Sequence, residues 1–476
     1  MLMINMVSLR LWRCKNVSAF PPLGQLPSLK HLYISGAEEV ERVGAEFYGT
    51  DSSSTKPSFV SLKALSFSFM PKWKEWLCLG SQGGEFPRLK ELYIQYCPKL
   101  TGDLPNHLPL LTKLEIKECE QLVAPLPRVP AIRELTTRNN SDVFFRSPAS
   151  DFMRLESLIT SDISQWTELP PVLQKLWIEN ANTLESLLEE EKLQSNTCLK
   201  DLTIRNCSFS RTLRGVCLPI TLKSLSIYAS KNLELLLLEF FKCHFSLLEG
   251  LNIYDSTCNS LSCFPLSIFP RLTFLQINEV RGLESLSFSI SEGDPTSFDE
   301  LFISRCPNLV SIELPALNFS RFSIYNCKNL KSLLHNAACF QSLTLGGCPE
   351  LIFPVQGLQG LASLRHFSIR GGCEDLELFP KECLLPSTLT SLKISHLPNL
   401  RSLDSKGLQL LTTLQKLEIS DCPKLQSLTE ERLPTSLSFL TIENCPLLKD
   451  RCKVGTGEDW HHIAHIPHIM IDDQLL

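Results

Sequence analysis

The stretch LKELYIQYCPKL, residues 89–100, contains the pattern that decides the fold. Leu89, Leu92 and Ile94 hold its apolar positions, and Cys97 follows three residues after the isoleucine. The Leu-x-Ile part alternates with period two, so its apolar members point to one side of a strand and the intervening residues to the other. Such a short strand cannot bury its apolar side alone, so the pattern predicts that similar strands stack against it.

The Leu-x-x-Leu-x-Ile template recurs along the chain when Met, Ile, Phe or Thr is allowed at some apolar positions. The spacing averages about 24 residues, which lies in the range of leucine-rich repeats. We therefore predict an α/β leucine-rich-repeat solenoid (horseshoe), with a parallel concave β-sheet and a convex side of irregular, 3-10 and short-helical segments. The 19 copies start at residues 6, 29, 62, 89, 111, 132, 155, 173, 199, 222, 248, 272, 298, 319, 340, 364, 389, 414 and 437.

The repeat pattern defines the expected domains. We predict a solenoid over residues 1–448 with a loop insertion near 41–57, where Ser, Thr and Gly are frequent and indicate an exposed loop. Residues 449–476 should form a C-terminal cap that shields the last repeat. The first copy has no visible cap before it, so we expect the chain to be part of a larger protein.

The copies near residues 132 and 155 depart from the template, because Thr137 occupies an isoleucine position. A hinge and simple decay of the repeat both explain this irregularity, and decay is the favoured interpretation.

A cysteine follows the isoleucine position by three residues in nine copies. Cysteine is small and readily buried, and its weak S–H donor can bond to a backbone carbonyl at the bend after the strand. The alternative is a metal or redox site. One cysteine per repeat, without Cys-x-x-Cys pairs, favours the structural interpretation. The nine are Cys14, Cys97, Cys119, Cys207, Cys306, Cys327, Cys348, Cys422 and Cys445.

Composition and charge give no indication of a nucleic-acid-binding, membrane-spanning or secreted protein. The formal net charge of −5 gives no reason to expect binding to nucleic acid. The longest apolar runs are far shorter than the roughly 18 residues that span a bilayer, and no secretory signal precedes the repeats. With 19 cysteines and no export signal, we expect reduced thiols and a cytoplasmic protein.

No motif predicts catalysis or a cofactor. The sequence contains neither a Gly-x-Ser-x-Gly elbow nor a Gly-x-x-x-x-Gly-Lys-Ser/Thr nucleotide loop, so we assign no catalytic, cofactor or metal residue. Four histidines near the C-terminus lack the glutamate of His-Glu-x-x-His, and we interpret them as structural or solvated. They are His461, His462, His465 and His468. The acidic run at 189–191 is interpreted as a solvated turn.

Several motifs resemble one family. Cysteine followed by leucine three residues later is typical of cytoplasmic plant repeats, and two pairs of motifs add specificity: VGAEFYG at 43–49 with WKEW at 73–76, and CPLLKDRC at 445–452 with GEDW at 457–460 and IAHIPH at 463–468. Together they resemble the leucine-rich-repeat region of plant intracellular immune receptors of the coiled-coil nucleotide-binding class, over essentially the whole chain.

The resemblance implies a recognition domain that senses pathogen effectors or guarded host proteins. It also implies that, in a full-length receptor, the repeats restrain a nucleotide-binding switch module, which this chain lacks. The alternative is a leucine-rich-repeat substrate receptor of a ubiquitin ligase, which an F-box-like helical segment upstream would indicate. An enzyme is the third hypothesis, and no sequence feature supports it.

The intervening strand positions should form the recognition face, because repeat solenoids commonly bind partners there. Tyr, Trp and Arg are enriched at binding hot spots. The competing explanation is that aromatic residues favour strands and stack between neighbouring repeats. The candidate partner-binding residues are Trp12, Tyr33, Tyr93, Tyr96, Trp177, Glu179, Arg205, Tyr228, Tyr254 and Tyr325.

Overall fold

The computed structural model divides into two compact units: unit 1 comprises the described residues up to Leu222, and unit 2 those from Lys223 onward. The residues that the structure describes are 5–49, 58–78, 84–123, 126–138, 149–161, 163, 166, 168–180, 184, 187, 193, 196–207, 218–243, 245–259, 261–290, 296–314, 317–334, 339–351, 358–472 and 474–475.

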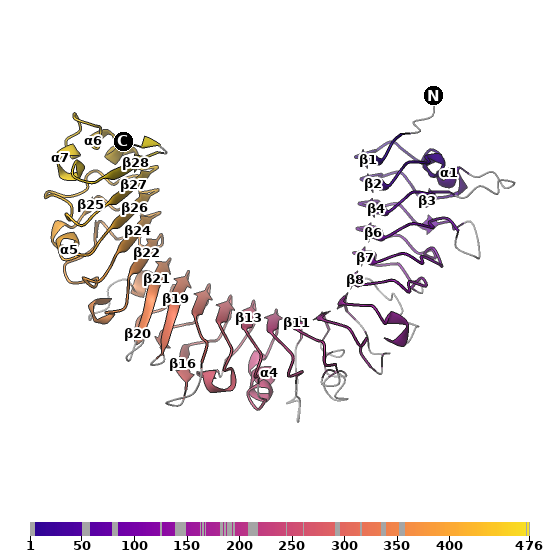
Figure 1. The fold of residues 1–476 in the computed structure, drawn as a ribbon, viewed down its shortest axis with the longest axis horizontal. Coiled ribbons are helices and arrows are strands. Elements are labelled where there is room, and N and C mark those ends of the chain that lie inside the picture. The colour runs from indigo at the N-terminus through magenta and orange to yellow at the C-terminus, as the bar shows by residue number, and fades with distance from the viewer. Residues whose placement is uncertain are drawn as a thin grey trace. The chain divides into compact units, whose positions relative to one another are not determined.

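Unit 1 is a ladder of parallel strands stacked in chain order, and the chain returns on the other side of each strand (Figure 1). Each strand begins two residues after an expected repeat start. The strands are β1 (Ser8–Trp12), β2 (His31–Ser35), β4 (Ala64–Ser68), β6 (Glu91–Gln95), β7 (Lys113–Lys117), β8 (Glu134–Arg138), β9 (Ser157–Thr160), β10 (Lys175–Ile178) and β11 (Asp201–Arg205).

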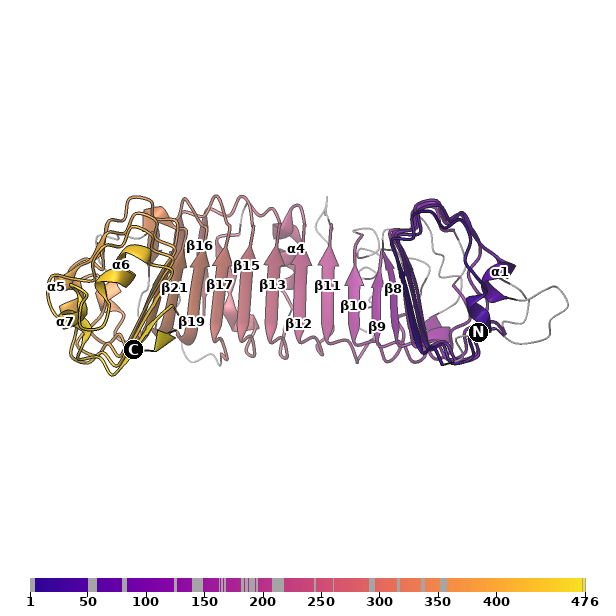
Figure 2. The ribbon, with the colours of Figure 1, turned by 90° about the horizontal axis from the view of Figure 1, so that it is seen from above.

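Unit 2 continues the same pattern, and its strands lie side by side when seen from above (Figure 2). Two of its strands, β19 and β21, begin earlier than the template and reach eight residues. The strands are β12 (Ser224–Tyr228), β13 (Gly250–Tyr254), β15 (Phe274–Asn278), β17 (Glu300–Ser304), β19 (Asn318–Tyr325), β21 (Cys339–Gly346), β22 (His366–Arg370), β24 (Ser391–Ser395), β26 (Lys416–Ser420), β27 (Phe439–Glu443), β28 (His468–Ile471) and the antiparallel β29 (Gln474–Leu475).

The register places equivalent apolar residues of neighbouring repeats opposite each other. Leu92 pairs with Leu114 and Ile94 with Ile116, and each of the four is at most 1% exposed. Burying such a side chain stabilises a protein by about 1.5–3 kcal/mol. The predicted parallel leucine-rich-repeat solenoid is therefore confirmed within each unit, and its core is the stacked leucine and isoleucine rows.

The bend after each strand confirms the predicted role of cysteine. The thiol of Cys97 donates to the carbonyl of Gln95 at 3.3 Å, and the other eight predicted cysteines bond the carbonyl two residues earlier at 3.3–3.9 Å. Cys373 makes the same bond at 3.4 Å although the sequence pattern missed it, because two glycines, Gly371 and Gly372, lengthen this bend by one residue.

The return side contains the expected short helices and 3-10 turns. They are α1 (Ala45–Tyr48), α4 (Leu233–Phe240), α5 (Ser405–Gln409), η1 (Leu23–Gln25), η2 (Ala149–Phe152), η3 (Leu266–Ile268), η4 (Pro349–Leu351) and η5 (Leu358–Gly360).

Three small parallel ladders on the return side were not predicted. The largest one forms because segments such as SLSFS at 285–289 alternate apolar and polar residues and thus also favour strands. The ladders join β14 (Cys263–Pro265), β16 (Ser285–Ser289), β18 (Ser311–Glu313) and β20 (Ser332–Leu334); β3 (Arg42–Val43) with β5 (Glu75–Trp76); and β23 (Leu378–Phe379) with β25 (Ser402–Leu403).

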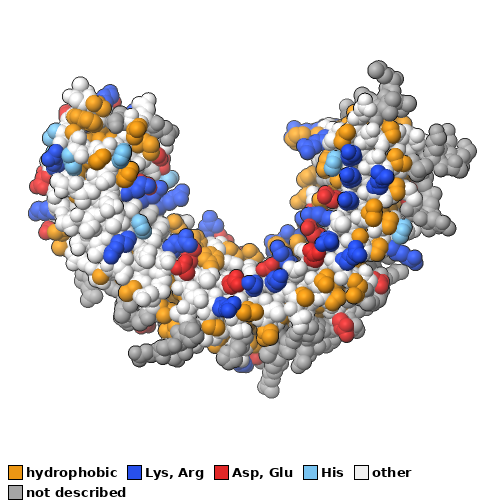
Figure 3. Space-filling model, viewed as in Figure 1, with side chains coloured by type: hydrophobic (Ala, Val, Ile, Leu, Met, Phe, Trp, Pro, Cys, Tyr) orange, Lys and Arg blue, Asp and Glu red, His pale blue; other side chains and the backbone are white. Residues whose placement is uncertain are grey.

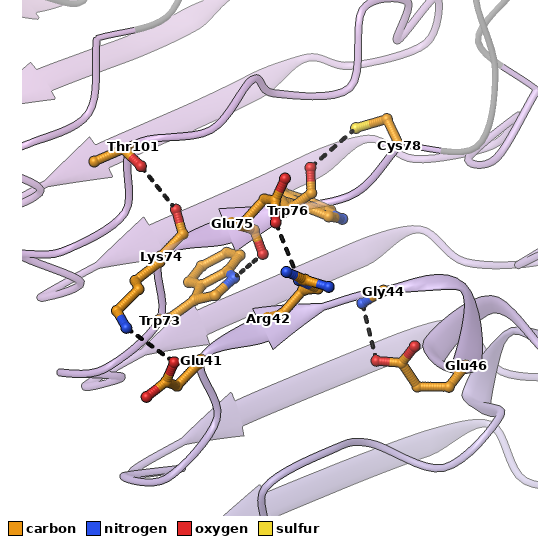
Figure 4. A network of polar contacts seen from close by, with 10 residues as sticks. All are labelled: Glu41, Arg42, Gly44, Glu46, Trp73, Lys74, Glu75, Trp76, Cys78 and Thr101. Carbon is orange, nitrogen blue, oxygen red and sulfur yellow. Dashed lines mark hydrogen bonds and ion pairs between the residues drawn. The ribbon is translucent and has the colours of Figure 1, made fainter.

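Two of the sequence motifs that carry the family resemblance pack against each other on the return side of unit 1 (Figure 4). Arg42 pairs with Glu75 at 3.0 Å, and the indole N–H of Trp76 donates to the hydroxyl of Tyr48 at 2.8 Å. Phe47 and Tyr48 are fully buried, so the expected exposed loop is wrong for this part of the insertion. Residues 50–57 lie outside the described residues, as does the acidic run at 189–191.

The two repeats that depart from the sequence template, near residues 132 and 155, keep the regular strand pairing of unit 1. Thr137 and Thr160 replace two buried isoleucines, and their hydroxyls bond each other at 3.1 Å. β8 and β9 keep the parallel register, because each buried hydroxyl has a partner in its neighbour. This arrangement favours decay of the repeat over a hinge.

The C-terminal segment adds a further strand to the sheet beyond the last repeat. It contains α6 (Pro446–Arg451) and α7 (Trp460–Ile463), and its strand β28 pairs in parallel with β27. Asp459 is buried and accepts from the Arg451 guanidinium at 2.7 Å and from the backbone N–H of Leu428 at 3.1 Å. The domain boundary at residue 448 stays a prediction. Over the described residues, no helix is both long and apolar enough to cross a membrane.

Candidate recognition surface

The strand face, defined as the side chains that alternate with the buried leucines and isoleucines, carries most of the candidate residues. Glu179 follows the last residue of β10 and Tyr96 follows the last residue of β6, whereas the others lie within strands. None of the ten is fully buried. The alternation predicted from sequence therefore keeps the eight strand residues out of the buried leucine and isoleucine rows.

In unit 1, four candidate aromatic rings lie beside basic side chains. Trp12 is 74% exposed, and the Arg13 guanidinium lies 5.4 Å from its ring centroid. Arg10 lies 5.2 Å from the Tyr33 ring on the next strand. Cation–π pairs at exposed sites contribute about 0.5–1 kcal/mol each.

Tyr93 is held by two neighbours. Its hydroxyl donates to Glu91 at 3.0 Å, and the Lys113 ammonium lies 5.9 Å from its ring. Burial and the nearby carboxylate raise the pKa of Tyr93 above its ordinary value, so this hydroxyl stays protonated and remains a donor.

Tyr96 projects from a bend and not from a strand. Its φ of 54° is left-handed, as is that of Phe69 one repeat earlier, and the two rings stack at 4.5 Å with 10° between their planes. Phe69 is 54% exposed and Tyr96 is 45% exposed. Two exposed, stacked aromatic rings form a rigid contact surface with little conformational entropy to lose on binding.

A mixed cluster joins three strands at the far end of unit 1. The Arg138 guanidinium lies 5.5 Å from the Trp177 ring and 2.8 Å from the Glu179 carboxylate. Arg205 approaches the same carboxylate oxygen at 3.5 Å. Arg138 is the last residue of β8 and Glu179 follows β10, so their ion pair reaches across the intervening strand β9.

The environment of Glu179 is unusual for an acid. Its side chain is only 7% exposed, and burial raises its pKa above the ordinary value while the charge of Arg138 opposes that shift. The charge and hydrogen bond of Arg138 favour the ionised form of Glu179, whereas its burial favours the neutral form. The cluster can act as a polar anchor whose charges a partner would rearrange.

In unit 2, the candidate tyrosines form two aromatic pairs. Tyr228 and Tyr254 stack at 4.5 Å with 6° between their planes, and the Tyr254 hydroxyl donates to Gln276 at 2.7 Å. Burial, followed by the proximity of Tyr228, raises the pKa of Tyr254. Tyr325 lies 5.5 Å from Phe302 on the preceding strand.

Sequence reasoning missed five partners of the candidate residues. Arg10 and Phe302 occupy the same alternating strand positions as the candidate residues. Lys113 and Arg138 are basic residues at the ends of strands. Phe69 precedes Tyr96 at the equivalent bend, and only the left-handed backbone explains its exposure.

The C-terminal histidines lie in and after α7. The rings of His461 and His462 are 3.7 Å apart, and His465 Nε2 lies 3.4 Å from the carbonyl of Pro434. Within the described parts of the chain, no three His, Cys, Asp or Glu side chains gather as metal ligands would.

The sequence matches three plant relatives. The Arabidopsis thaliana protein At3g14460, named as a disease resistance protein, is 28% identical over 99% of this chain and 45% of its own length. The RPP13-like protein 1 of the same plant, also named for disease resistance, is 34% identical over 44% of this chain and 21% of its own. RGA4 of Solanum bulbocastanum, likewise so named, is 38% identical over 20% of this chain and 9% of its own. The chain thus spans less than half of each relative.

No family model matches the sequence. Among solved structures, the complex of TLR13 with ssRNA13 covers 96% of this chain and 90% of its own at 14% identity, with a TM-score of 0.35. The Arabidopsis receptor kinase HAESA, with the peptide hormone IDA and the co-receptor SERK1, covers 92% and 79% at 16% identity, with a TM-score of 0.34. These scores are too low to support an argument about ligands.

Proposed function

We propose, from its kinship with plant disease resistance proteins, that this chain is the recognition region of such a receptor and binds a pathogen effector or a guarded host protein. The strand face is its binding surface. It acts in the cytoplasm and catalyses no reaction, since its sequence offers a binding surface and no catalytic motif.

The observation that carries the proposal is the pairing of aromatic and basic side chains on that face. Tyr228 stacked on Tyr254 and Trp177 beside Arg138 are rigid, partly exposed side chains of the types that dominate protein interfaces. Trp12 lies on β1, the first strand of the ladder, and is 74% exposed, so a partner can reach its ring.

In a full-length receptor, the same face restrains a nucleotide-binding switch module. An effector that competes for this face shifts the receptor towards its active state only if it binds that state more tightly. This mechanism needs no chemistry from the repeats, because a difference in affinity between the two states is sufficient.

The proposal is tested by co-expressing the chain in leaf cells with a panel of effectors from plant pathogens and measuring the Kd of any partner by calorimetry. Changing Trp177, Tyr228 and Tyr254 together to Ala should weaken binding at least thirtyfold, roughly the loss of one hot spot of about 2 kcal/mol.

The matched control changes three exposed apolar residues of the return side, Leu238, Val310 and Leu410, to Ala. This control should leave the Kd within about twofold, since residues outside an interface contribute little. Equal losses in both triple variants, or no loss in the first, would remove the strand face as the binding surface.

A further inference from the structure

A hollow of about 580 Å³ opens on the strand face of unit 2. Its lining comes from β15, β17, β19, β21 and β22 and from the bends that follow the strands, as far as His396 after β24. We call it the glycine-floored hollow. Its volume lies within the roughly 300–1,000 Å³ of ligand sites. None of the ten candidate residues except Tyr325 lines it.

Glycines create the hollow. Gly346 ends β21, and a Cβ atom there would lie 2.7 Å from the ring of Tyr325 and 2.9 Å from the carbonyl of Arg370. Gly347 and Gly371 follow in left-handed conformations, with φ of 62° and 57°. Side chains are therefore missing from two neighbouring bends, and the floor is backbone, bordered by the Tyr325 ring.

The charge of the lining has one sign. Among the described lining residues, Arg305, Arg370 and His396 are basic and none is acidic. Arg305 is paired with Glu279 at 2.6 Å, and His396 Nε2 lies 3.5 Å from Asp421. No ion pair of Arg370 occurs within the described part of the chain, and its side chain is exposed.

Basic side chains also gather on the strand side of unit 2 near β22 and β24 (Figure 3). The chain as a whole carries a net charge of −5, so this basic region is a local contrast. A hollow lined by one sign of charge concentrates the field and attracts the opposite charge.

The extent of the hollow indicates what kind of anion it fits. Its lining crosses five strand spacings, from β15 to β24, which is roughly 24 Å. A single carboxylate or phosphate would fill only a small part of that length, whereas an extended peptide of about seven residues would match it. The Phe302 and Tyr325 rings border the floor, and the Asn326 amide can pair with a peptide backbone.

We propose that the glycine-floored hollow binds an acidic peptide segment of a partner protein, with a carboxylate of that segment paired to the Arg370 guanidinium. The inference rests on the proposed function, because it gives the partner chemistry of one part of the strand face. It is separable from that function, because the aromatic anchors Trp177, Tyr228 and Tyr254 do not line the hollow.

The test is fluorescence anisotropy of the whole chain with a fluorescein-labelled heptapeptide of alternating Gly and Glu, at physiological ionic strength. The matched peptide carries Gln in place of Glu. The acidic peptide should bind about tenfold more tightly, because a charge-assisted hydrogen bond contributes about 1.5 kcal/mol or more. Equal affinity of the two peptides, or no binding of either, would overturn the proposal.

Variants locate the contact. Arg370→Gln should remove the tenfold preference and Arg370→Lys should retain part of it, because Lys keeps the charge but loses the bidentate geometry. The matched control is Arg401→Gln, an exposed arginine of unit 2 that pairs with Glu377 at 3.3 Å and does not line the hollow. Equal losses for Arg401→Gln and Arg370→Gln would show non-specific attraction and overturn the site. Thermal unfolding by circular dichroism confirms that each variant is folded.

A competition arm separates the peptide from a small anion. Inorganic phosphate and free glutamate should displace the acidic heptapeptide only at concentrations far above its Kd. If phosphate bound as tightly as the peptide and with the same dependence on Arg370, the hollow would be a small-anion site and the peptide proposal would be wrong. If a partner protein binds through the aromatic anchors but the acidic peptide does not bind, this inference is overturned and the proposed function stands.

Discussion

At the scale of single residues, many of the bends that follow strands combine a left-handed residue with a buried thiol. The residue before the cysteine is left-handed in repeat after repeat, for example Arg305 with φ of 52° and Asp421 with φ of 53°. Such strain costs about 1 kcal/mol or more for a residue other than glycine. It is offset because the same residue donates its backbone N–H to the next strand, at 2.8 Å from Arg305 to Tyr325 and 3.0 Å from Asp421 to Glu443.

The buried thiol of Cys373 should be unreactive in the folded protein. Burial raises the pKa of Cys373 to about 12 from an ordinary value of 9.0, so at pH 8 only about one such thiol in ten thousand is ionised. With Ellman's reagent, the exposed Cys263 and Cys383 should react promptly and Cys373 only after unfolding. Replacing Cys383 with Ser should reduce the number of rapidly reacting thiols by one, whereas Cys373→Ser should leave that number unchanged. A lower number of rapidly reacting thiols in Cys373→Ser would show that the Cys373 thiol is reactive in the folded protein.

The same shift gives a pH dependence of stability. A folded-state pKa above the unfolded value favours the folded state fully below about pH 9, where the thiol is neutral in both states. Above pH 9 the unfolded thiol ionises and the folded one does not, so this contribution is lost as pH rises towards 12.

At the scale of elements, the C-terminal segment depends on one buried acid. Asp459 joins Arg451 at the end of α6 to the backbone of Leu428 in the return segment between β26 and β27. The sequence singled out the GEDW motif at 457–460 through its family resemblance, but it gave no physical role for the aspartate. The ion pair becomes visible only when the chain has turned back on itself.

Replacing Asp459 with Ala should lower the local free energy of opening at α6 and β28 by about 2 kcal/mol, because it leaves the buried backbone N–H of Leu428 without its acceptor and the Arg451 guanidinium with only the exposed Glu458 as a partner. Hydrogen exchange of the backbone amides in β28 measures this energy directly. Asp450→Ala is the matched control: Asp450 is 74% exposed and pairs only with Lys453, so exchange should hardly change. Similar exchange rates in both variants would show that Asp459 does not hold the segment.

The strands were predictable because their leucines and isoleucines recur at a similar spacing in every copy. The agreement between copies supports the prediction of each single strand. The return segments were harder, since their length and composition vary from repeat to repeat. Phe47 and Tyr48 lie in a Gly-rich insertion that reads as an exposed loop, yet they are buried against the aromatic side chains Phe59 and Trp76 from another segment. Long-range contacts of this kind leave no signal at short sequence spacing.

The candidate binding residues were predictable only by position. Alternation indicated that Tyr228 and Tyr254 face outward, but their stacking follows from the register of β12 and β13. The hollow was not predictable, because Gly346 and Gly371 look like ordinary turn residues until neighbouring repeats bring them together.

At the scale of the whole molecule, each unit is a quasi-one-dimensional stack in which every strand contacts its neighbours in sequence. Such a stack separates stability from recognition. The buried leucine rows hold the fold, and the alternating outward positions are free to vary without loss of the core. The proposed recognition role benefits from this separation.

The central claim is that a partner contacts the strand face and not the return side. The most direct measurement is site-specific photo-crosslinking with benzoylphenylalanine placed at Tyr254 or Trp12, compared with Leu238 or Leu410 on the return side. We predict that the partner crosslinks at the two strand-face positions and hardly at the other two. Crosslinks concentrated at Leu238 and Leu410, with none at Tyr254 or Trp12, would contradict the claim.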